Sequence, residues 1–393
     1  MRKHMNSSVY KTFTTLLFFS VFIPIQQFAQ INEKNIELGK IITINSEVLN
    51  ENREIFVYLP IDYERAENKY PVIYILDGRG NFAFSATTSN FLSRIQRMPR
   101  SIVIGIPNTD RTRDFTPVHD KGSPTSGGAD KFLEFMETEL IPHIDNNYRT
   151  YSYKTLYGHS LCWMFAIYTL FEKPDMFNSY IAVSPYLQFA DQAVLNRVES
   201  ILSERKKFNK HLHITLGNEP AYTASLNRIE ILLSEKTKGL TWKISKHENE
   251  DHVSVPLKSL YDGLEFIYSD WRLKNKTIEE GLEAIKIHYS NVGEKYGFGI
   301  NPAESVINVL GYRYLGNENY ENAIDVFKYN VELYPKSANV YDSLGDALEK
   351  DGRHQEAFEN YKMAVEIGTS NNDRNLKIYK QNLDRLDSTN KAN

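Results

Sequence analysis

The segment TLYGHSLCWMFAIYTLF, residues 155–171, decides the choice of fold. Its first residues favour a strand and the apolar run from Cys162 onward favours a helix, with Gly-His-Ser at the junction. In the motif G-x-S-x-G, a serine occupies such a turn, with its hydroxyl exposed at the sheet edge and the following N–H groups free to bind an oxyanion. Here Gly158 precedes Ser160 by two residues, but Cys162 follows it by two. The segment therefore predicts a nucleophilic serine on an altered turn.

Strand-like and helix-like segments alternate from residue 36 to 271, which predicts an α/β fold with a mainly parallel sheet. Strands are predicted at 39–47, 53–60, 71–78, 101–107, 154–160, 179–185, 212–217 and 241–247. The clearest helices are predicted directly after Ser160 and at 128–148, 191–208, 223–239 and 255–271, where apolar residues recur three and four positions apart. The Gly-, Pro- and Ser-rich segment 115–130 is predicted to be a loop near the carboxyl edge of the sheet.

Composition and the N-terminus bound the class of protein. The chain has 393 residues, with 46 basic and 50 acidic side chains and a formal charge of -4, and neither a basic stripe nor an acidic tail indicates a nucleic-acid partner. Cys162 is the single cysteine, which excludes an intramolecular disulfide. Basic residues followed by an apolar run too short to span a bilayer predict a signal peptide over 1–29, cleaved after Ala29. We therefore expect a periplasmic or secreted protein without a stable membrane span.

The C-terminal part of the sequence repeats itself with a period of 34 residues. Leu310-Gly311 matches Leu344-Gly345, Ala323 matches Ala357, and Phe327 matches Tyr361. This pattern is typical of tetratricopeptide repeats, in which small residues let paired helices cross closely. The sequence predicts an esterase-type domain over 30–275, a linker or packing helix over 276–303, two repeats over 304–371, and a capping helix and tail over 372–393. Flanking helices are expected at 277–290 and 374–386, and the repeats predict a site for a protein partner.

A serine hydroxyl needs a histidine base and an acid that orients it, in the chain order Ser, Asp/Glu, His for this fold. Glu219 follows the predicted strand 212–217, at the sheet edge where functional side chains of open α/β sheets gather. His252 lies in a loop directly before a predicted helix, whereas its competitor His247 ends a strand. The sequence therefore favours Ser160, Glu219 and His252 as the catalytic set.

With these residues in place, the chain resembles the putative esterase family of α/β-hydrolases, which includes siderophore esterases, feruloyl esterase modules and mycobacterial mycolyltransferases. The resemblance covers residues 36–271 and rests on PVIYILDGRGNF, IVIGIPNTDRTRDFTP, GHSL, FNSYIAVSP, LGNE and HVSVPLKSLYDGLEF, in the family's order and spacing. It implies Ser160 as nucleophile, Glu219 as acid and His252 as base. It also implies an oxyanion site between the backbone N–H groups of Leu161 and Arg79, with no metal and no organic cofactor.

The sequence departs from this family directly after the serine, where Cys162-Trp163 replaces two glycines. We expect Trp163 to press on the segment after residue 76 and to border the substrate pocket, together with Tyr186 and Arg113. The interpretation is an exported serine carboxylesterase acting on a small-molecule ester. Acyl transfer would use the same residues, and the alternative is a catalytically impaired binding or scaffold protein that acts through its repeats.

Overall fold

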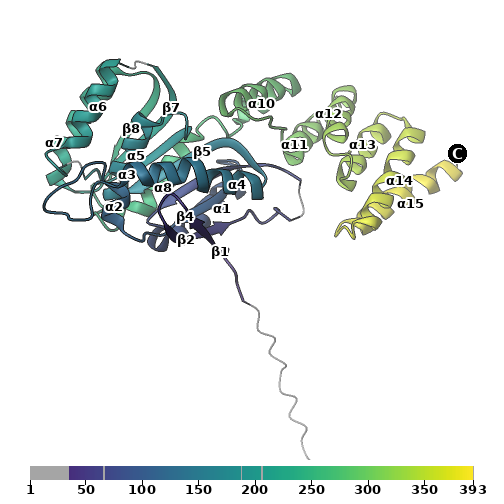
Figure 1. Cartoon of the computed structure of the whole chain (residues 1–393). Coiled ribbons are helices and arrows are strands. Elements are labelled where there is room, and N and C mark those ends of the chain that lie inside the picture. The colour runs from purple at the N-terminus through teal and green to yellow at the C-terminus, as the bar shows by residue number, and fades with distance from the viewer. Residues whose placement is uncertain (1–34, 65–66, 187, 205–206, 393) are drawn as a thin grey trace, which may run out of the picture. The chain divides into compact units, whose positions relative to one another are not determined.

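The computed structural model describes residues 35–64, 67–186, 188–204 and 207–392 (Figure 1). The predicted signal peptide, 1–29, lies outside these residues. Residues Leu38–Asn393 form one compact unit, which is described by itself below.

An eight-stranded sheet runs through the described part of the N-terminal region. Its strands are β1 (Lys40–Ser46), β2 (Glu51–Tyr58), β3 (Tyr70–Leu76), β4 (Ile102–Ile106), β5 (Thr150–His159), β6 (Ser179–Val183), β7 (Lys207–Leu216) and β8 (Lys238–Lys246). The strand order is β1-β2-β4-β3-β5-β6-β7-β8. Only the pairs β1–β2 and β2–β4 are antiparallel in this sheet, and β3 to β8 run parallel. Each predicted strand coincides with one of these, and the predicted α/β class is confirmed.

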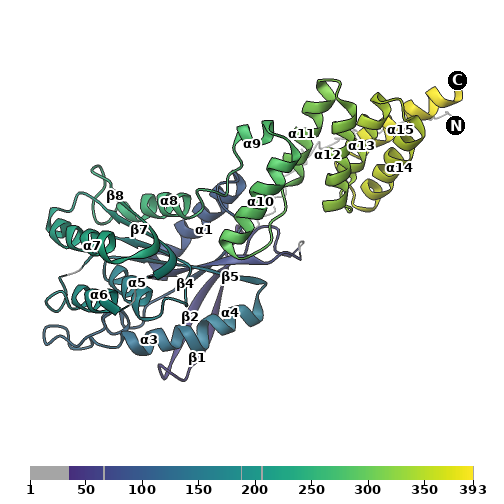
Figure 2. The ribbon, with the colours of Figure 1, turned by 90° about the horizontal axis from the view of Figure 1, so that it is seen from above.

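Helices cover both faces of the sheet, because β3 to β7 are buried on both sides at their centres (Figure 2). One face packs against α1 (Gly78–Arg94) and α8 (Val255–Ile267). The other face packs against α3 (Ala129–Phe135), the π-helical turn Met136–Leu140, α4 (Ile141–Asn147), α5 (Leu161–Glu172), α6 (Ala193–Glu204) and α7 (Thr223–Lys236). The short α2 (Arg111–Phe115) precedes the predicted loop, whose residues 116–128 lie outside any helix. This arrangement places the turns after β3, β5, β6 and β7 at one edge.

The C-terminal region is all-helical over the residues described. It consists of α9 (Asn275–Glu279), α10 (Leu282–Tyr296), α11 (Glu304–Gly316), α12 (Tyr320–Leu333), α13 (Ala338–Lys350), α14 (His354–Ser370) and α15 (Leu376–Ala392). α13 begins 34 residues after α11, and α14 begins 34 residues after α12. The sequence period therefore corresponds to two helical hairpins of the same length.

Glycines allow the close crossing within each hairpin. A Cβ atom at Gly311 would lie 2.4 Å from the ring of Phe327, and one at Gly345 would lie 2.6 Å from the ring of Tyr361. Since real Cβ contacts are not that short, each glycine creates the space for the aromatic ring of its partner helix. This is the packing that the 34-residue pattern predicts.

Helix α10 packs against the N-terminal core. Val292, Tyr296 and Phe298 belong to the same buried cluster as Tyr153 and Tyr268. The Tyr296 hydroxyl donates a hydrogen bond of 2.8 Å to the Ile267 carbonyl, and the rings of Tyr151 and Phe298 stack with centroids 4.2 Å apart. The apolar core of the α/β region thus extends to about residue 300, beyond the boundary at 275 that composition predicts.

No helix in the described ranges combines the length and the apolar character that crossing a bilayer requires.

Candidate active site

Ser160 occupies a sharp turn between β5 and α5. Its φ and ψ of 60° and -118° are a strained combination for a residue with a side chain. Its backbone N–H donates to the Val183 carbonyl of β6 at 2.9 Å, which ties the turn to the sheet. Gly158 is needed because a Cβ there would lie 2.3 Å from the Cys162 carbonyl oxygen. The first glycine of the motif therefore lets the strand and the helix approach, and the second position tolerates cysteine.

Glu219 and His252 form a direct pair at the same edge. His252 Nδ1 lies 2.5 Å from Glu219 Oε1. The other carboxylate oxygen, Oε2, accepts hydrogen bonds from Ser184 Oγ at 2.6 Å and from the Gly217 N–H at 3.0 Å. The Glu219 side chain is only 7% exposed, so these three donors take the place of water. Both carboxylate oxygens are thus engaged, and the carboxylate is held in one orientation against the imidazole.

The residue before the serine brings His252 to the turn. The rings of His159 and His252 have centroids 4.6 Å apart. His247, the competing base, lies instead 3.4 Å from Asp262 through its Nε2. The arrangement therefore joins Glu219 to His252, as the sequence predicts, and leaves His247 in a separate ion pair.

The turn after β3 faces the Ser160 turn. Asp77 adopts the left-handed conformation with φ of 53°, and α1 begins at the next residue. Gly78 fits because a Cβ there would lie 2.7 Å from the Ile106 nitrogen. Arg79 is in the first turn of α1 and Leu161 in the first turn of α5, where backbone N–H groups have no acceptor within their own helix. These two N–H groups are suited to bind an oxyanion.

Arg111 connects the two turns. Its Nη2 lies 2.9 Å from Asp77 Oδ2 and its Nε lies 3.0 Å from both carboxylate oxygens. The same Nη2 donates to the His159 carbonyl at 3.3 Å and contacts Cys162 Sγ at 3.9 Å. Burial acts to raise the pKa of Asp77, but the hydrogen bonds and charge of Arg111 outweigh it and leave the pKa below its ordinary value. Asp77 therefore stays ionised and paired with Arg111.

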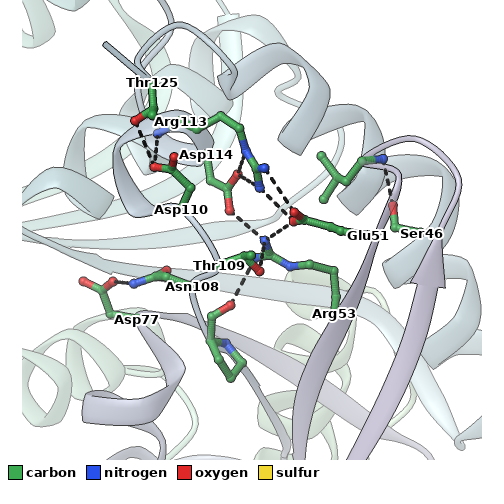
Figure 3. A network of polar contacts seen from close by, with 12 residues as sticks. Ser46, Glu51, Arg53, Asp77, Asn108, Thr109, Asp110, Arg113, Asp114 and Thr125 are labelled. Carbon is green, nitrogen blue, oxygen red and sulfur yellow. Dashed lines mark hydrogen bonds and ion pairs between the residues drawn. The ribbon is translucent and has the colours of Figure 1, made fainter. Parts of the chain in front are cut away.

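A buried ion-pair network anchors the segment that carries Arg111 (Figure 3). Arg53 of β2 donates to Asp114 at 2.8 Å, and neither side chain is exposed. Arg113 binds the same carboxylate at 2.7 Å and Glu51 at 2.7 Å. Arg113, predicted to border the substrate pocket, is therefore engaged in fixing α2 to the edge of the sheet.

Trp163 lies in the hydrophobic core and is fully buried. It packs in the cluster on the α5 face, whereas Phe82 of the segment after β3 belongs to the cluster on the α1 face. This placement does not support a pocket-lining role for Trp163 or pressure on that segment. Cys162 is also fully buried, beside the Arg111–Asp77 pair, and burial raises the pKa of its thiol well above the ordinary value.

Aromatic side chains border the acid–base pair. The ring of Tyr222 lies 6.0 Å from that of His252, and the ring of half-buried Tyr186 lies 6.3 Å from that of Tyr222. Tyr186 is therefore close enough to the site for the predicted pocket role. Tyr222 and Ser184 were not identified from the sequence. The only signal for Ser184 is its place after the strand 179–183, where a side chain reaches the same edge as Glu219.

Comparison with known proteins agrees with this arrangement. The chain is 33% identical over 194 residues to the ferri-bacillibactin esterase BesA of Bacillus subtilis, covering 42% of this chain and 65% of that protein. It is 30% identical over 162 residues to a siderophore enterobactin esterase of Emericella nidulans, covering 35% of this chain and 53% of that protein. The chain thus spans less than two thirds of the length of these curated relatives.

A solved structure extends the similarity. An IroE-like serine hydrolase from Shewanella oneidensis superposes with a TM-score of 0.66 and 27% identity, over 75% of this chain and 99% of that one. The model of the putative esterase family matches residues 46–256, more than half of the chain. The protein therefore belongs to the putative esterase family.

Proposed function

We propose that this protein is a serine carboxylesterase in which Ser160, His252 and Glu219 act as one catalytic unit. The observation that carries the proposal is the 2.5 Å contact between His252 Nδ1 and Glu219 Oε1 beside the strained Ser160 turn. A carboxylate on Nδ1 keeps the proton there, so that Nε2 is free to accept the serine proton. Family membership and the esterase relatives support the same reaction.

The mechanism follows from these roles. Ser160 Oγ attacks the ester carbonyl carbon while His252 accepts its proton, and the carbonyl oxygen becomes an oxyanion. The N–H groups of Leu161 and Arg79 stabilise that charge. The imidazolium then protonates the leaving alcohol, and an acyl group remains on Ser160. A water molecule, deprotonated by His252, attacks the acyl-enzyme, so that one carboxylic acid and one alcohol are released and the serine is restored.

We extend the proposal to the substrate class. The curated relatives are named for ferri-bacillibactin and enterobactin, so siderophore esters are the first substrates to test. The N-terminal pattern of residues 1–29 supports export to the periplasm or the medium, where such an ester would be met.

Fluorophosphonate labelling of the purified protein tests the catalytic proposal. Covalent capture is expected at Ser160 in the native protein and not in the Ser160→Ala variant. If the folded native protein were not labelled, the alternative of a catalytically impaired scaffold would be favoured. Hydrolysis of enterobactin, followed by chromatography of the released acids, tests the substrate class separately.

A second role is proposed for α11 to α14, as tetratricopeptide repeats that bind a protein partner. The observation that favours it is a groove of about 900 Å³ along α11 that reaches Asn339 of α13, where Val309 is 54% exposed. A photo-crosslinking residue at Val309 should capture one defined partner in the native cell. The same adduct formed from position Lys276 would contradict a specific site.

A further inference from the structure

A small polar cavity adjoins the predicted oxyanion site. It has a volume of about 350 Å³ and is lined by Asp77, Arg79, Gly80, Asn81, Asn108 and His159. These residues come from three places: the turn into α1, the segment after β4, and the Ser160 turn. Because Arg79 and His159 flank the predicted reaction centre, any part of an ester that extends past the carbonyl on this side enters the cavity.

Two polar atoms of the lining residues lack a partner among the residues described. They are Asn108 Oδ1 and His159 Nε2, and both are buried. The Asn108 amide nitrogen donates to Asp77 Oδ1, so its carbonyl oxygen is directed elsewhere. A buried polar atom without a hydrogen bond destabilises the protein, which is why such atoms often mark ligand sites.

The protonation state of His159 makes its free nitrogen an acceptor. Burial, and the nearby His252, lower the pKa of His159 to about 4, so that the ring is neutral at pH 7. The ring also makes a hydrogen bond to the His252 backbone that favours its charged form, which requires the ring to be the donor. Since Nε2 has no partner, the proton is on Nδ1, and Nε2 carries a lone pair.

The other polar groups of the cavity are already engaged. The Asp77 carboxylate is paired with Arg111, the Asn81 amide donates to the Leu76 carbonyl at 3.0 Å, and the Arg79 guanidinium is paired with Glu54. Two neutral acceptors are left over. A carboxylate or phosphate would face two lone pairs, and a cation would lie beside Arg79 and Arg111. The chemistry that fits is a neutral hydrogen-bond donor.

We propose that this cavity is a substrate subsite that selects esters carrying a hydroxyl or amide N–H group close to the scissile bond. The proposal rests on the esterase function and narrows its substrate class. Asn108 and His159 would accept the hydrogen bond of that group. An ester of the same size without a donor would leave both atoms unpaired, and sites of this kind discriminate strongly against such analogues.

Three small esters test the subsite. Ethyl butanoate is the reference, ethyl 3-hydroxybutanoate carries a hydroxyl on the acyl side, and 2-hydroxyethyl butanoate carries one on the alcohol side. Acid release in a pH-stat gives kcat/KM for each. At least one hydroxylated ester should exceed the reference by about 10-fold, as expected for a hydrogen bond to otherwise unpaired groups.

The variants decide whether the cavity causes the preference. His159→Phe keeps a planar ring but removes the acceptor, and the ratio of kcat/KM values should fall to about one. His213→Phe is the matched control, because His213 is a buried histidine on β7 outside the cavity, and it should keep the native ratio. Asn108→Ala is a second variant, expected to lower the ratio, should His159→Phe not fold.

Absence of a preference in the native protein, or a native ratio in both His159→Phe and Asn108→Ala, would overturn the subsite. If no ester were cleaved, the esterase proposal itself would fail. Binding of 2-hydroxyethyl butanoate to the native protein, followed by ligand line broadening in NMR, would then test the cavity alone. Broadening that is lost in His159→Phe supports the subsite, and no broadening contradicts it.

Discussion

His252 Nδ1 lies 2.5 Å from Glu219 Oε1, while Glu219 Oε2 accepts hydrogen bonds from Ser184 and Gly217. If this carboxylate orients the base, Glu219→Gln should lower kcat for a p-nitrophenyl ester by about 10³-fold or more with the fold intact, because an amide stabilises the imidazolium poorly. Ser160→Ala and His252→Ala should each remove nearly all hydrolysis. His247→Ala is the matched control. Full activity in His252→Ala, with loss in His247→Ala, would contradict the assignment of the base.

Arg111 is predicted to position the oxyanion donors, because it binds both Asp77 and the His159 carbonyl. Arg111→Ala should lower kcat by roughly 100-fold, the effect of losing one oxyanion donor, with little change in KM for a short ester. Arg111→Lys should restore only part of this, since an ammonium cannot bind all three acceptors in one plane. Arg97→Ala, which breaks an Arg–Glu265 pair on the α1 and α8 helices, is the control. An equal loss in both variants would indicate a general effect on stability.

Much of the fold could be predicted from the sequence because the signals are local. Buried parallel strands read as apolar runs of five to ten residues, and the 34-residue period identifies the helical hairpins directly. The site was predictable where chain order constrains it, for Ser160, Glu219 and His252. Ser184, Arg53 and Arg111 were not assigned their roles, since these depend on partners 35 to 61 residues away that only the folded sheet brings together.

The boundary at residue 275 shows another limit of sequence reasoning. Composition changes there, but the side chains of α10 complete the core around Tyr153 and Tyr268. A chain truncated after Lys274 should therefore be destabilised by several kcal/mol relative to one truncated after Asn301, since each lost aromatic side chain buries roughly 150–250 Å². Urea unfolding monitored by tyrosine and tryptophan fluorescence measures the difference. Equal midpoints would show that α10 adds nothing to this core.

Buried histidines predict an acid-sensitive fold. Burial is the largest cause that lowers the pKa of His211 and His213 to about 4, from an ordinary value of 6.5. Between these two pH values the unfolded chain binds protons that the native protein does not, so the free energy of unfolding must decrease as pH falls from about 6.5 to 4. In His213→Gln the decrease should correspond to about one proton less. Urea titrations at pH 7, 6, 5 and 4.5 test this, and an unchanged slope would contradict it.

The last prediction concerns Cys162 and Trp163. The close approach at Gly158 exists with cysteine in place, and the Cys162 thiol fills space beside Arg111 and Asp77. Cys162→Gly should therefore lower stability by about 1 kcal/mol or more, as glycine does in a helix, without raising kcat. Trp163→Ala should cost about 3–5 kcal/mol, because it empties a core position that is fully buried.

Turnover per folded molecule, measured together with thermal melting, separates these effects on activity and stability. A large increase of kcat in Cys162→Gly would show that the cysteine restrains the oxyanion donors, contrary to the packing seen here. If Trp163→Ala melted like the native protein but lost hydrolysis of bulky esters only, the indole would belong to the substrate pocket after all. The expected result is the reverse, a lower melting temperature with the same order of preference among esters, because the indole contacts the core and reaches no solvent.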